Sequence, residues 1–261
     1  MQAILIANMN AKPGRDDDYN DWYTNVHIRD AMRFKGSVAV QRFVAAEAQV
    51  MPGRPKYKYL ALYEASDAEL VMQEHFDAAD TPRFVPTDAS ERSDPSDHHH
   101  YVLQFRANDP ADRTPLGGAV ILEQFNALSG REKPLVDWYN QTRIAGALTL
   151  PGIISCHFMK FLPIGQLFVR PPQHLFSAVY RTSNLVESID AWRSHGLSEK
   201  VPIECCDIPG SRVVCYEPVI ARLTKDDVLH ASPQELAVEQ RARAKAAASP
   251  PTPWKEWIKT V

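Results

Sequence analysis

The sequence predicts an α+β fold made of two tandem copies of one β-α-β-β-α-β unit, and three observations lead to this prediction. The segment AILIANMN at 3–10 aligns with AVILEQFN at 119–126, at an offset of 116 residues. The same offset carries Asp21-Trp22-Tyr23 onto Asp137-Trp138-Tyr139. Around both matches, apolar runs and segments of helical spacing alternate in the same order. The chain is therefore expected to repeat one structural unit.

The first copy opens with a strand and a helix. Residues 3–9 are apolar at successive positions, which is typical of a buried strand. Apolar and aromatic residues at helical spacing predict a helix over 16–34, whose three leading aspartates suit a helix N-terminus. Gly36 is expected to end this helix.

A hairpin, a second helix and a last strand complete the first copy. Two runs rich in Val, Phe, Tyr and Leu, at 37–46 and 57–64, flank the turn sequence MPGRPK and predict the hairpin. Ser66, with Glu69 three residues later, predicts the capping box of the second helix. A strand at about 99–106 closes the copy.

The second copy contains the same elements in the same order. They are predicted as strand 119–126, helix 131–149, strands 153–162 and 174–181, helix 184–195 and strand 211–217. This order is that of the ferredoxin-like unit, which carries its helices on one face of the sheet. The other apolar face needs cover, which each copy can supply to the other. We therefore expect a pseudo-dimeric α+β barrel in which two sheets pack face to face with the helices outside.

The predicted division of the chain leaves a C-terminal extension. The divisions are 1–110 for the first unit, 117–220 for the second and 221–261 for the extension. Ser232-Pro233-Gln234-Glu235 is a strong start for a helix that runs to about 248. Beyond it, a Pro-rich arm carries Trp254 and Trp257, which predict an anchor either on the protein body or on a second subunit of a homo-oligomer.

Composition and charge exclude several classes of function. Lys and Arg number 29 against 32 Asp and Glu, a net charge of -3 that provides no basic surface for nucleic acid. No apolar run approaches the roughly 20 residues that span a bilayer, and the N-terminus lacks the features of a signal peptide. We expect a soluble, cytoplasmic protein with no nucleic-acid or membrane partner, whose four cysteines are free buried thiols.

The first copy contains several motifs in succession: Asp21-Trp22-Tyr23, His27-Ile28-Arg29-Asp30, Gly36 and the strand segment Val38-Ala39-Val40-Gln41-Arg42-Phe43. With these motifs the sequence resembles the EthD-like branch of the dimeric α+β barrel superfamily. The second copy keeps Tyr139 but has Arg143 where His27 stands. Family members typically hold one unit per chain and dimerise, so the resemblance implies a fused dimer. The superfamily includes cofactor-free monooxygenases, polyketide cyclases, dehydratases, isomerases and lyases, so the resemblance implies a fold rather than one reaction.

The first helix carries the candidate catalytic group. Tyr19, Tyr23 and His27 are spaced four residues apart and share one helix face, and the resemblance implies ligands between this helix and the sheet. An imidazole beside two phenols can move a proton near neutral pH while the phenols hold an oxyanion. The alternative is a hydrogen-bonded core histidine among aromatics. Arg42, on the next strand, either binds a carboxylate or enolate or forms a salt bridge at the strand end.

Polar residues in the apolar strands are further candidates for substrate binding. Asn8 and its repeat partner Gln124 either line a pocket or satisfy a local network. Alternation sends His98 and His100 to one face of the last strand of the first copy. No carboxylate or thiol motif accompanies them, so we expect no metal site and favour a second acid/base group.

Two more features lie close to the candidate base. Asp30, three residues beyond His27, either orients the imidazole or pairs with Arg29 and Arg33 on the surface, and the surface role is favoured. A polar, Pro-containing loop at 77–98 is long enough to act as a lid.

The second copy places different groups at the equivalent positions. Arg143 replaces the histidine, Tyr139 remains, and Glu123 stands where the first copy has Ala7. A carboxylate in an apolar strand either pairs with Arg143 or helps to form a second, chemically different pocket. The broken symmetry predicts one histidine-based site per chain.

Together these observations predict a cofactor-independent enzyme that uses acid/base chemistry on a small apolar, aromatic or polyketide-like substrate. The sequence holds no Gly-rich dinucleotide loop, P-loop or flavin signature, so lyase, dehydratase, isomerase or cyclase chemistry is favoured over redox chemistry. A cofactor-free monooxygenase stays open, because an electron-rich substrate can supply its own electrons to O₂. The sequence is also compatible with a non-catalytic small-molecule-binding or stress-type barrel, and with a haem-binding barrel that uses His174 or His195 as ligand.

Overall fold

The two halves of the chain share one succession of elements. A computed structural model describes residues 2–91, 97–107, 118–164, 173–197, 200–248 and 250, and within 97–107 it describes the side chain of Tyr101 alone. The first half contains β1 (Ala3–Met9), α1 (Asp16–Trp22), η1 (Tyr23–His27), α2 (Ile28–Met32), β2 (Ser37–Ala45), β3 (Tyr59–Ala65), α3 (Ala68–Ala78) and β4 (Asp97–Ala107). The second contains β5 (Ala119–Phe125), α4 (Glu132–Trp138), η2 (Tyr139–Arg143), α5 (Ile144–Ala147), β6 (Ile153–Phe161), β7 (Phe176–Thr182), α6 (Leu185–Ser194) and β8 (Arg212–Pro218). The predicted α+β fold class is confirmed.

Each half interrupts its first helix with a wider, π-helical turn that the sequence pattern does not predict. These turns, η1 and η2, occupy equivalent positions of the repeat and end on His27 and Arg143 respectively. π-Helical turns are rare and often lie at functional sites. His27 and Arg143, which differ in chemistry, therefore share one unusual backbone position.

Glycine is required where each first helix turns into the next strand. Gly36 and Gly152 have φ angles of +83° and +80°, in the left-handed region. A Cβ atom on Gly36 would lie 2.7 Å from the Asp67 carbonyl oxygen, and one on Gly152 would lie 2.4 Å from Ser188 Oγ. Both the conformation and the space exclude a side chain there.

The predicted cap of the second helix is wrong by one residue. α3 begins after Asp67, whose carboxylate accepts a hydrogen bond from the Leu70 amide at 3.3 Å. The Ser66 hydroxyl donates instead to the Gly36 carbonyl at 3.1 Å. Ser and Asp are comparable N-caps, so the local sequence does not choose between neighbours, whereas the packing of the chain against Gly36 does.

The eight main strands close into a barrel. The strand order is β2-β3-β1-β4 in the first half and β6-β7-β5-β8 in the second. Antiparallel pairs β4–β6 and β2–β8 join the halves at both edges. Each of these eight strands thus has a partner on both sides, which removes the exposed edges that promote aggregation. The sequence predicts sheets that face each other, and the structure adds hydrogen bonding between their edges.

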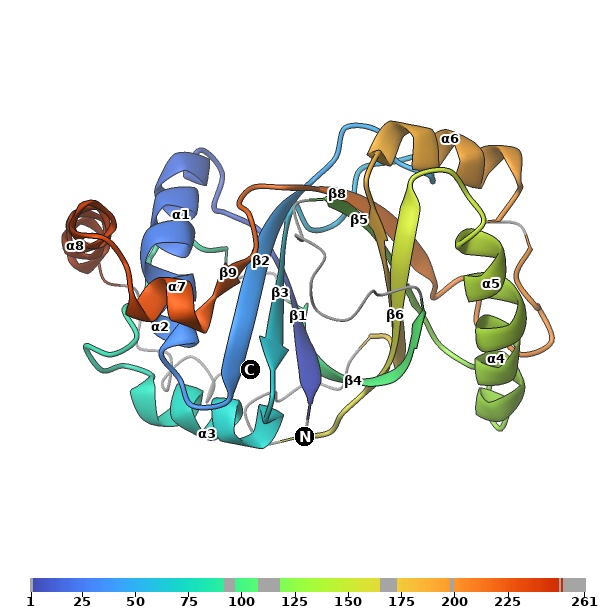
Figure 1. The fold of residues 1–261 in the computed structure, drawn as a ribbon, viewed down its shortest axis with the longest axis horizontal. Helices are drawn as coiled ribbons and strands as arrows, with labels where there is room; N and C mark the ends of the chain where they lie inside the picture. The colour runs from blue at the N-terminus through green and yellow to red at the C-terminus, as the bar shows by residue number, and fades with distance from the viewer. Residues whose placement is uncertain are drawn as a thin grey trace.

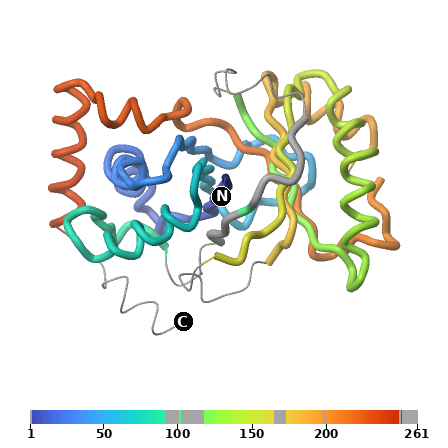
Figure 2. The backbone as a smooth tube through the Cα atoms, turned by 60° about the horizontal axis from the view of Figure 1, so that its bottom comes forward, coloured from blue at the N-terminus to red at the C-terminus, as the bar shows by residue number. Residues whose placement is uncertain are grey.

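Hydrophobic cores lie both inside and outside this barrel. The inner core draws on both halves, with Ile6 and Leu62 from the first and Leu122 and Val179 from the second. Two further cores lie between each sheet and its own helices. Figure 1 shows α1 to α3 on one side of the barrel and α4 to α6 on the other, and Figure 2 gives a turned view of the same layers. The inner core confirms the predicted face-to-face packing.

The C-terminal extension contributes a strand and two helices. β9 (Leu223–Thr224) pairs with β2, and α7 (Lys225–Leu229) leads to α8 (Pro233–Ala247). The predicted helix start at Ser232 is confirmed, since Ser232 and Glu235 form a capping box at the N-terminus of α8. α8 packs against α1 and η1 on the outside of the first half (Figure 1). Trp254 and Trp257 lie outside the described residues. None of the helices described combines the length and apolar character needed to cross a bilayer.

Candidate functional site

His27 lies in an aromatic cluster on the inner side of the first helix. Its ring centroid is 4.6 Å from that of Tyr23 and 4.5 Å from that of Trp22. A third ring, Phe84, comes from the loop after α3 and lies 4.7 Å away. The loop proposed as a lid, as far as it is described, thus reaches the imidazole. His27 is partly exposed, whereas Tyr23 is 1% exposed.

Arg42 enters this cluster from β2 with its guanidinium fully buried. Its side chain donates to Asn20 Oδ1 at 2.9 Å and to Thr24 Oγ1, and its Cζ atom lies 4.3 Å from the Tyr23 ring centroid. Among the described residues, no carboxylate lies within 4.0 Å of this guanidinium. Of the two roles that the sequence leaves open for Arg42, the salt bridge at the strand end is not found among the described residues, and the side chain bonds the first helix of this half to the sheet.

Tyr23 and Tyr63 form a buried phenol pair beside His27. The Tyr63 hydroxyl donates to the Tyr23 hydroxyl at 2.9 Å. Burial raises the pKa of Tyr23 to about 12, against the opposing effects of the hydrogen bond and of Arg42. Tyr23 is therefore a neutral hydrogen-bonding group at physiological pH. Tyr19 is also buried and its hydroxyl donates to Met9 Sδ at 3.4 Å, so it contributes to the wall beneath Tyr23.

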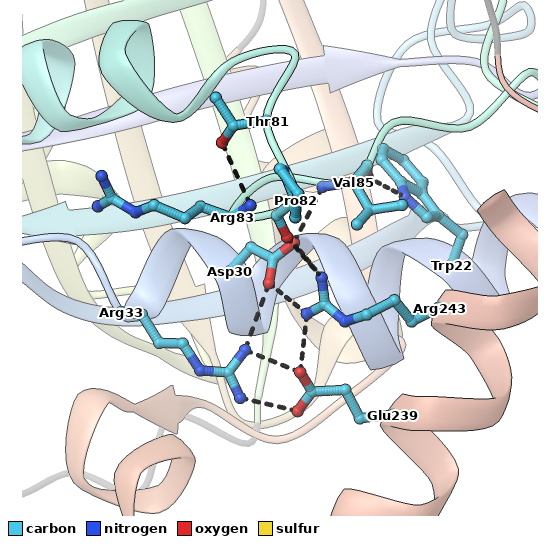
Figure 3. A network of polar contacts seen from close by, with 9 residues as sticks. All are labelled: Trp22, Asp30, Arg33, Thr81, Pro82, Arg83, Val85, Glu239 and Arg243. Carbon is cyan, nitrogen blue, oxygen red and sulfur yellow. Dashed lines mark hydrogen bonds and ion pairs between the residues drawn. The ribbon is translucent and has the colours of Figure 1, made fainter.

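Asp30 is not the surface residue that the sequence favours. Its side chain is 2% exposed and lies at the centre of the network in Figure 3. It accepts hydrogen bonds from Arg243 Nη2 at 2.5 Å, Arg33 Nη1 at 3.3 Å and the Val85 amide at 3.2 Å. The cause is α8, which covers this face of the first helix. Burial raises the pKa of Asp30, while Arg243 opposes the shift.

The same network fixes the loop that carries Phe84. Trp22 Nε1 donates to the Val85 carbonyl at 2.8 Å, while the Val85 amide donates to Asp30. Arg243 Nη1 donates to the Pro82 carbonyl at 3.4 Å (Figure 3). α8 therefore acts on the surroundings of His27 through this loop.

Asn8 and Gln124 belong to polar networks inside the barrel rather than to the His27 cluster. Tyr216 Oη donates to Asn8 Oδ1 at 3.5 Å. Gln124 Nε2 donates to Ser177 Oγ at 3.2 Å, and Gln124 Oε1 accepts from Arg212 Nε at 2.8 Å. The sequence allows either a pocket wall or a local hydrogen-bond network at these positions, and both residues take part in such a network.

His98 and His100 are placed by the backbone register of β4. His98 pairs with Ala7 of β1, and His100 pairs with Leu5. Ala7 and Leu5 both pack in the core beneath the first helix. The histidine side chains themselves lie outside the described part of the structure.

In the second half, Glu123 and Arg143 form the ion pair that the sequence offers as one possibility. Arg143 Nη2 lies 2.6 Å from Glu123 Oε1 and Nε lies 3.2 Å from Oε2, with both side chains less than 5% exposed. Tyr180 Oη also donates to Glu123 Oε2 at 3.2 Å, and Arg143 Nη1 donates to the Leu197 carbonyl. Burial disfavours the charge on Arg143, but Glu123 and Tyr180 more than compensate, so the pKa of Arg143 is raised.

A cavity of about 340 Å³ opens beside this pair. Glu123, Tyr139 and Arg143 line it together with residues of the loop after α6 and of β8. Its remaining wall is the β2–β3 hairpin of the first half, residues 49–56. The sequence signals this hairpin as a turn, but nothing local indicates that it covers the second half. The pairing of β2 with β8 brings it there.

The two helix–sheet gaps have diverged in their aromatic content. At the position equivalent to Arg42, the second half has Phe158, in a stack with Phe125, Tyr139 and Phe176. The Phe125 and Tyr139 rings are 3.9 Å apart and within 6° of parallel. The helix–sheet gap of the first half thus holds the buried Arg42 among tyrosines. The gap of the second half holds an aromatic stack, and its buried cation is Arg143.

The two histidines considered as haem ligands have protein contacts. His174 Nε2 lies 2.7 Å from the Gly210 carbonyl oxygen, and His195 Nδ1 lies 2.8 Å from that of Ala191. Within the described ranges, no group of three His, Cys, Asp or Glu side chains is arranged to hold a metal ion.

Comparison with known proteins places the fold. No protein-family model matches the sequence, and no curated protein matches it. An anthrone oxidase-like protein of known structure is 13% identical, covers 88% of this chain and 96% of its own, and has a TM-score of 0.58. A candidate monooxygenase from Fusobacterium nucleatum is 5% identical, covers 85% and 94%, and has a TM-score of 0.55. At these identities the likeness is one of fold, and the fold is that of the dimeric α+β barrels.

Proposed function

We propose that this protein is an enzyme that transfers a proton to and from a small aromatic or polyketide-like substrate, with His27 as the acid/base group and no bound cofactor. One observation carries the proposal. Arg143 ends η2, follows Tyr139 and lines a cavity, and His27 ends η1 and follows Tyr23 in the same way. The repeat therefore supports a ligand site next to the imidazole in the first half.

The groups around His27 suit enolate chemistry. A histidine can accept a proton from carbon beside a carbonyl near neutral pH and return it elsewhere. Tyr23, kept neutral by a pKa of about 12, can donate a hydrogen bond to the oxyanion that forms. Arg42 lies against the Tyr23 ring and bonds the first helix, so it acts as a positioning residue that also supplies positive charge. Elimination, isomerisation and cyclisation all start from such an enolate.

A cofactor-free monooxygenase is the second candidate function. The two similar folds described above carry the names anthrone oxidase-like protein and candidate monooxygenase. The first step is the same for both functions, since a base must remove a proton before an electron-rich enolate can reduce O₂. For anthrone the balanced outcome is anthraquinone and one water from one O₂, so oxygen uptake separates the two.

The experiment uses a set of enolisable aryl ketones that includes anthrone. Without oxygen, exchange of the acidic carbon-bound protons into D₂O is followed by NMR, and oxygen uptake is then measured in air. We expect the protein to accelerate exchange and His27→Gln to lower the rate roughly 10²- to 10⁴-fold, because an amide cannot titrate near neutral pH. His195→Gln, which changes an exposed histidine, is the matched control.

The competing interpretations give different results. A folded His27→Gln protein with the wild-type exchange rate would contradict the role of His27. Binding of the ketones with no exchange above buffer would indicate the non-catalytic barrel. If His27 is only a core residue, His27→Ala lowers the melting temperature while the exchange rate per folded molecule survives.

A further inference from the structure

We propose that the cavity of the second half is a separate binding site for a small aromatic carboxylate. This inference does not depend on the role of His27, because no residue of α1, η1 or α2 is among the described residues that line the cavity. It rests on the Tyr139 hydroxyl, on the charges that surround the cavity and on the apolar residues at its mouth.

The Tyr139 hydroxyl lacks the partner that its counterpart has. In the first half, Tyr63 donates to Tyr23. The equivalent of Tyr63 is Tyr180, whose hydroxyl donates to Glu123 instead. Glu123 stands where the first half has Ala7, and it takes the hydrogen bond that the equivalent tyrosine of the first half gives to Tyr23.

Among the described residues, the Tyr139 hydroxyl has no hydrogen-bond partner, although the residue is 1% exposed and lines the cavity. The oxygen of a ligand in the cavity can supply the missing hydrogen bond.

The charge around the cavity selects an anion. Of the described residues that line it, four are basic and one is acidic, and the acidic one, Glu123, is paired with Arg143. Arg54, exposed on the hairpin, adds a positive charge to this lining, and Lys56 and Arg212 are its other basic members, with Arg212 donating to Gln124. A concave site with this balance attracts negatively charged ligands.

The remaining lining is apolar and rigid. Met51 and Ile208 line the cavity while staying 45% and 44% exposed, so large apolar side chains reach solvent at its rim. Deeper in, Tyr139 is held flat by its stack on Phe125. The volume of about 340 Å³ is at the lower end of the range of small-molecule sites, which run from about 300 to 1,000 Å³. A flat apolar body with one carboxylate matches these features.

This site is expected to bind without proton transfer. Arg143 stands where His27 stands in the first half, and no histidine is among the described residues that line the cavity. At this position the first half thus has the imidazole of His27, and the second half has the guanidinium of Arg143, paired with the Glu123 carboxylate.

The test compares two probes by calorimetry on the full chain. 2-Naphthoate is the anion, and 2-naphthylmethanol is its neutral analogue. We expect 2-naphthoate to bind at least about tenfold more tightly than the alcohol, and Tyr139→Phe to weaken it by about tenfold or more, as loss of a hydrogen bond to a charged group does. Tyr23→Phe, the same change in the other half, is expected to leave its affinity unchanged.

A second pair of variants tests charge at the rim. Ile208→Glu places a carboxylate beside the cavity and is expected to weaken 2-naphthoate but not the alcohol. Ile203→Glu is the matched control, because Ile203 lies on the same loop, is 74% exposed and does not line the cavity. Melting curves verify that each variant is folded.

Several results would overturn the proposal. These are no binding of 2-naphthoate, equal binding of both probes, or wild-type affinity in both Tyr139→Phe and Ile208→Glu. Loss of 2-naphthoate binding in His27→Gln or Tyr23→Phe, with binding kept in Tyr139→Phe, would assign the ligand to the first half. Failure of the exchange experiment at His27 with 2-naphthoate binding intact would refute the proposed enzyme alone.

Discussion

His75 is a partly buried imidazole that has no part in the proposed chemistry but makes the fold sensitive to acid. Its ring lies 4.5 Å from Phe84 and 5.9 Å from Phe34, and burial lowers its pKa from 6.5 to about 4. Between these pH values the unfolded chain takes up a proton that the folded chain excludes. The free energy of unfolding therefore falls as the pH drops from about 6.5 to 4, by at most about 3 kcal/mol from this group.

Urea denaturation at pH 7, 5.5 and 4.5 measures this effect. His75→Phe keeps an aromatic ring against Phe84 and should lose less stability over that range than the wild type. His195→Phe, at an exposed position, should follow the wild type. Parallel pH profiles for His75→Phe and the wild type would show that His75 is protonated in the folded state. Because Phe84 also contacts His27, acid is expected to loosen the loop at the candidate site first.

At the scale of elements, α8 is held by charge rather than by a broad apolar face. Glu239 accepts two hydrogen bonds from Arg33, at 2.8 and 2.9 Å, and Arg243 connects Glu239 to Asp30 (Figure 3). Burial alone would raise the pKa of Glu239, but the bonds from Arg33 and Arg243 outweigh it and the pKa lies below its usual value. Both arginines thus keep this carboxylate charged.

Substituting Arg243 alone should lower the free energy of unfolding more than substituting both Asp30 and Arg243. Arg243→Met leaves Asp30 buried with a weaker set of partners, and we expect a loss of roughly 3 kcal/mol, as for other broken buried pairs. Asp30→Asn together with Arg243→Met should recover part of this loss, which urea denaturation can measure. Lys245→Met breaks a more exposed pair with Asp18 and should cost less than about 1 kcal/mol. Equal losses for Arg243→Met and Lys245→Met would argue against a structural role for the buried network.

At the scale of the molecule, each half depends on the other for closure. Alone, either half would leave the inner face of its sheet and two strand edges exposed, because β4–β6 and β2–β8 are the only pairings that join the halves among the described strands. We expect residues 1–110 expressed alone to self-associate. Residues 1–110 co-expressed with 117–261 should form a one-to-one complex with a single cooperative melting transition, measured by light scattering and calorimetry. A first half that stays folded and monomeric would show that closure is not needed for stability.

The sequence by itself determined the repeat, the order of elements and the chemical contrast between the halves. Strand and helix periods are local, and the offset of 116 residues is visible without a structure. For the same reason the sequence predicts that His27 and Arg143 occupy equivalent positions, and it offers the pairing of Arg143 with Glu123 that the structure contains. The helix boundaries were predicted within a few residues, whereas the π-helical turns and the choice of Asp67 as cap were missed.

Tertiary structure alone decided which residues surround the two gaps. The hairpin 49–56 covers the second-half cavity because β2 pairs with β8, and Asp30 is buried because Arg243, 213 residues later, packs over it. Free strand edges and polar helix faces look alike in sequence whether they meet solvent or a distant segment. The partners of these edges and faces depend on how the whole barrel closes, because closure buries apolar surface and pairs strand edges between segments far apart in the chain. Contacts of that kind leave no pattern in the local sequence.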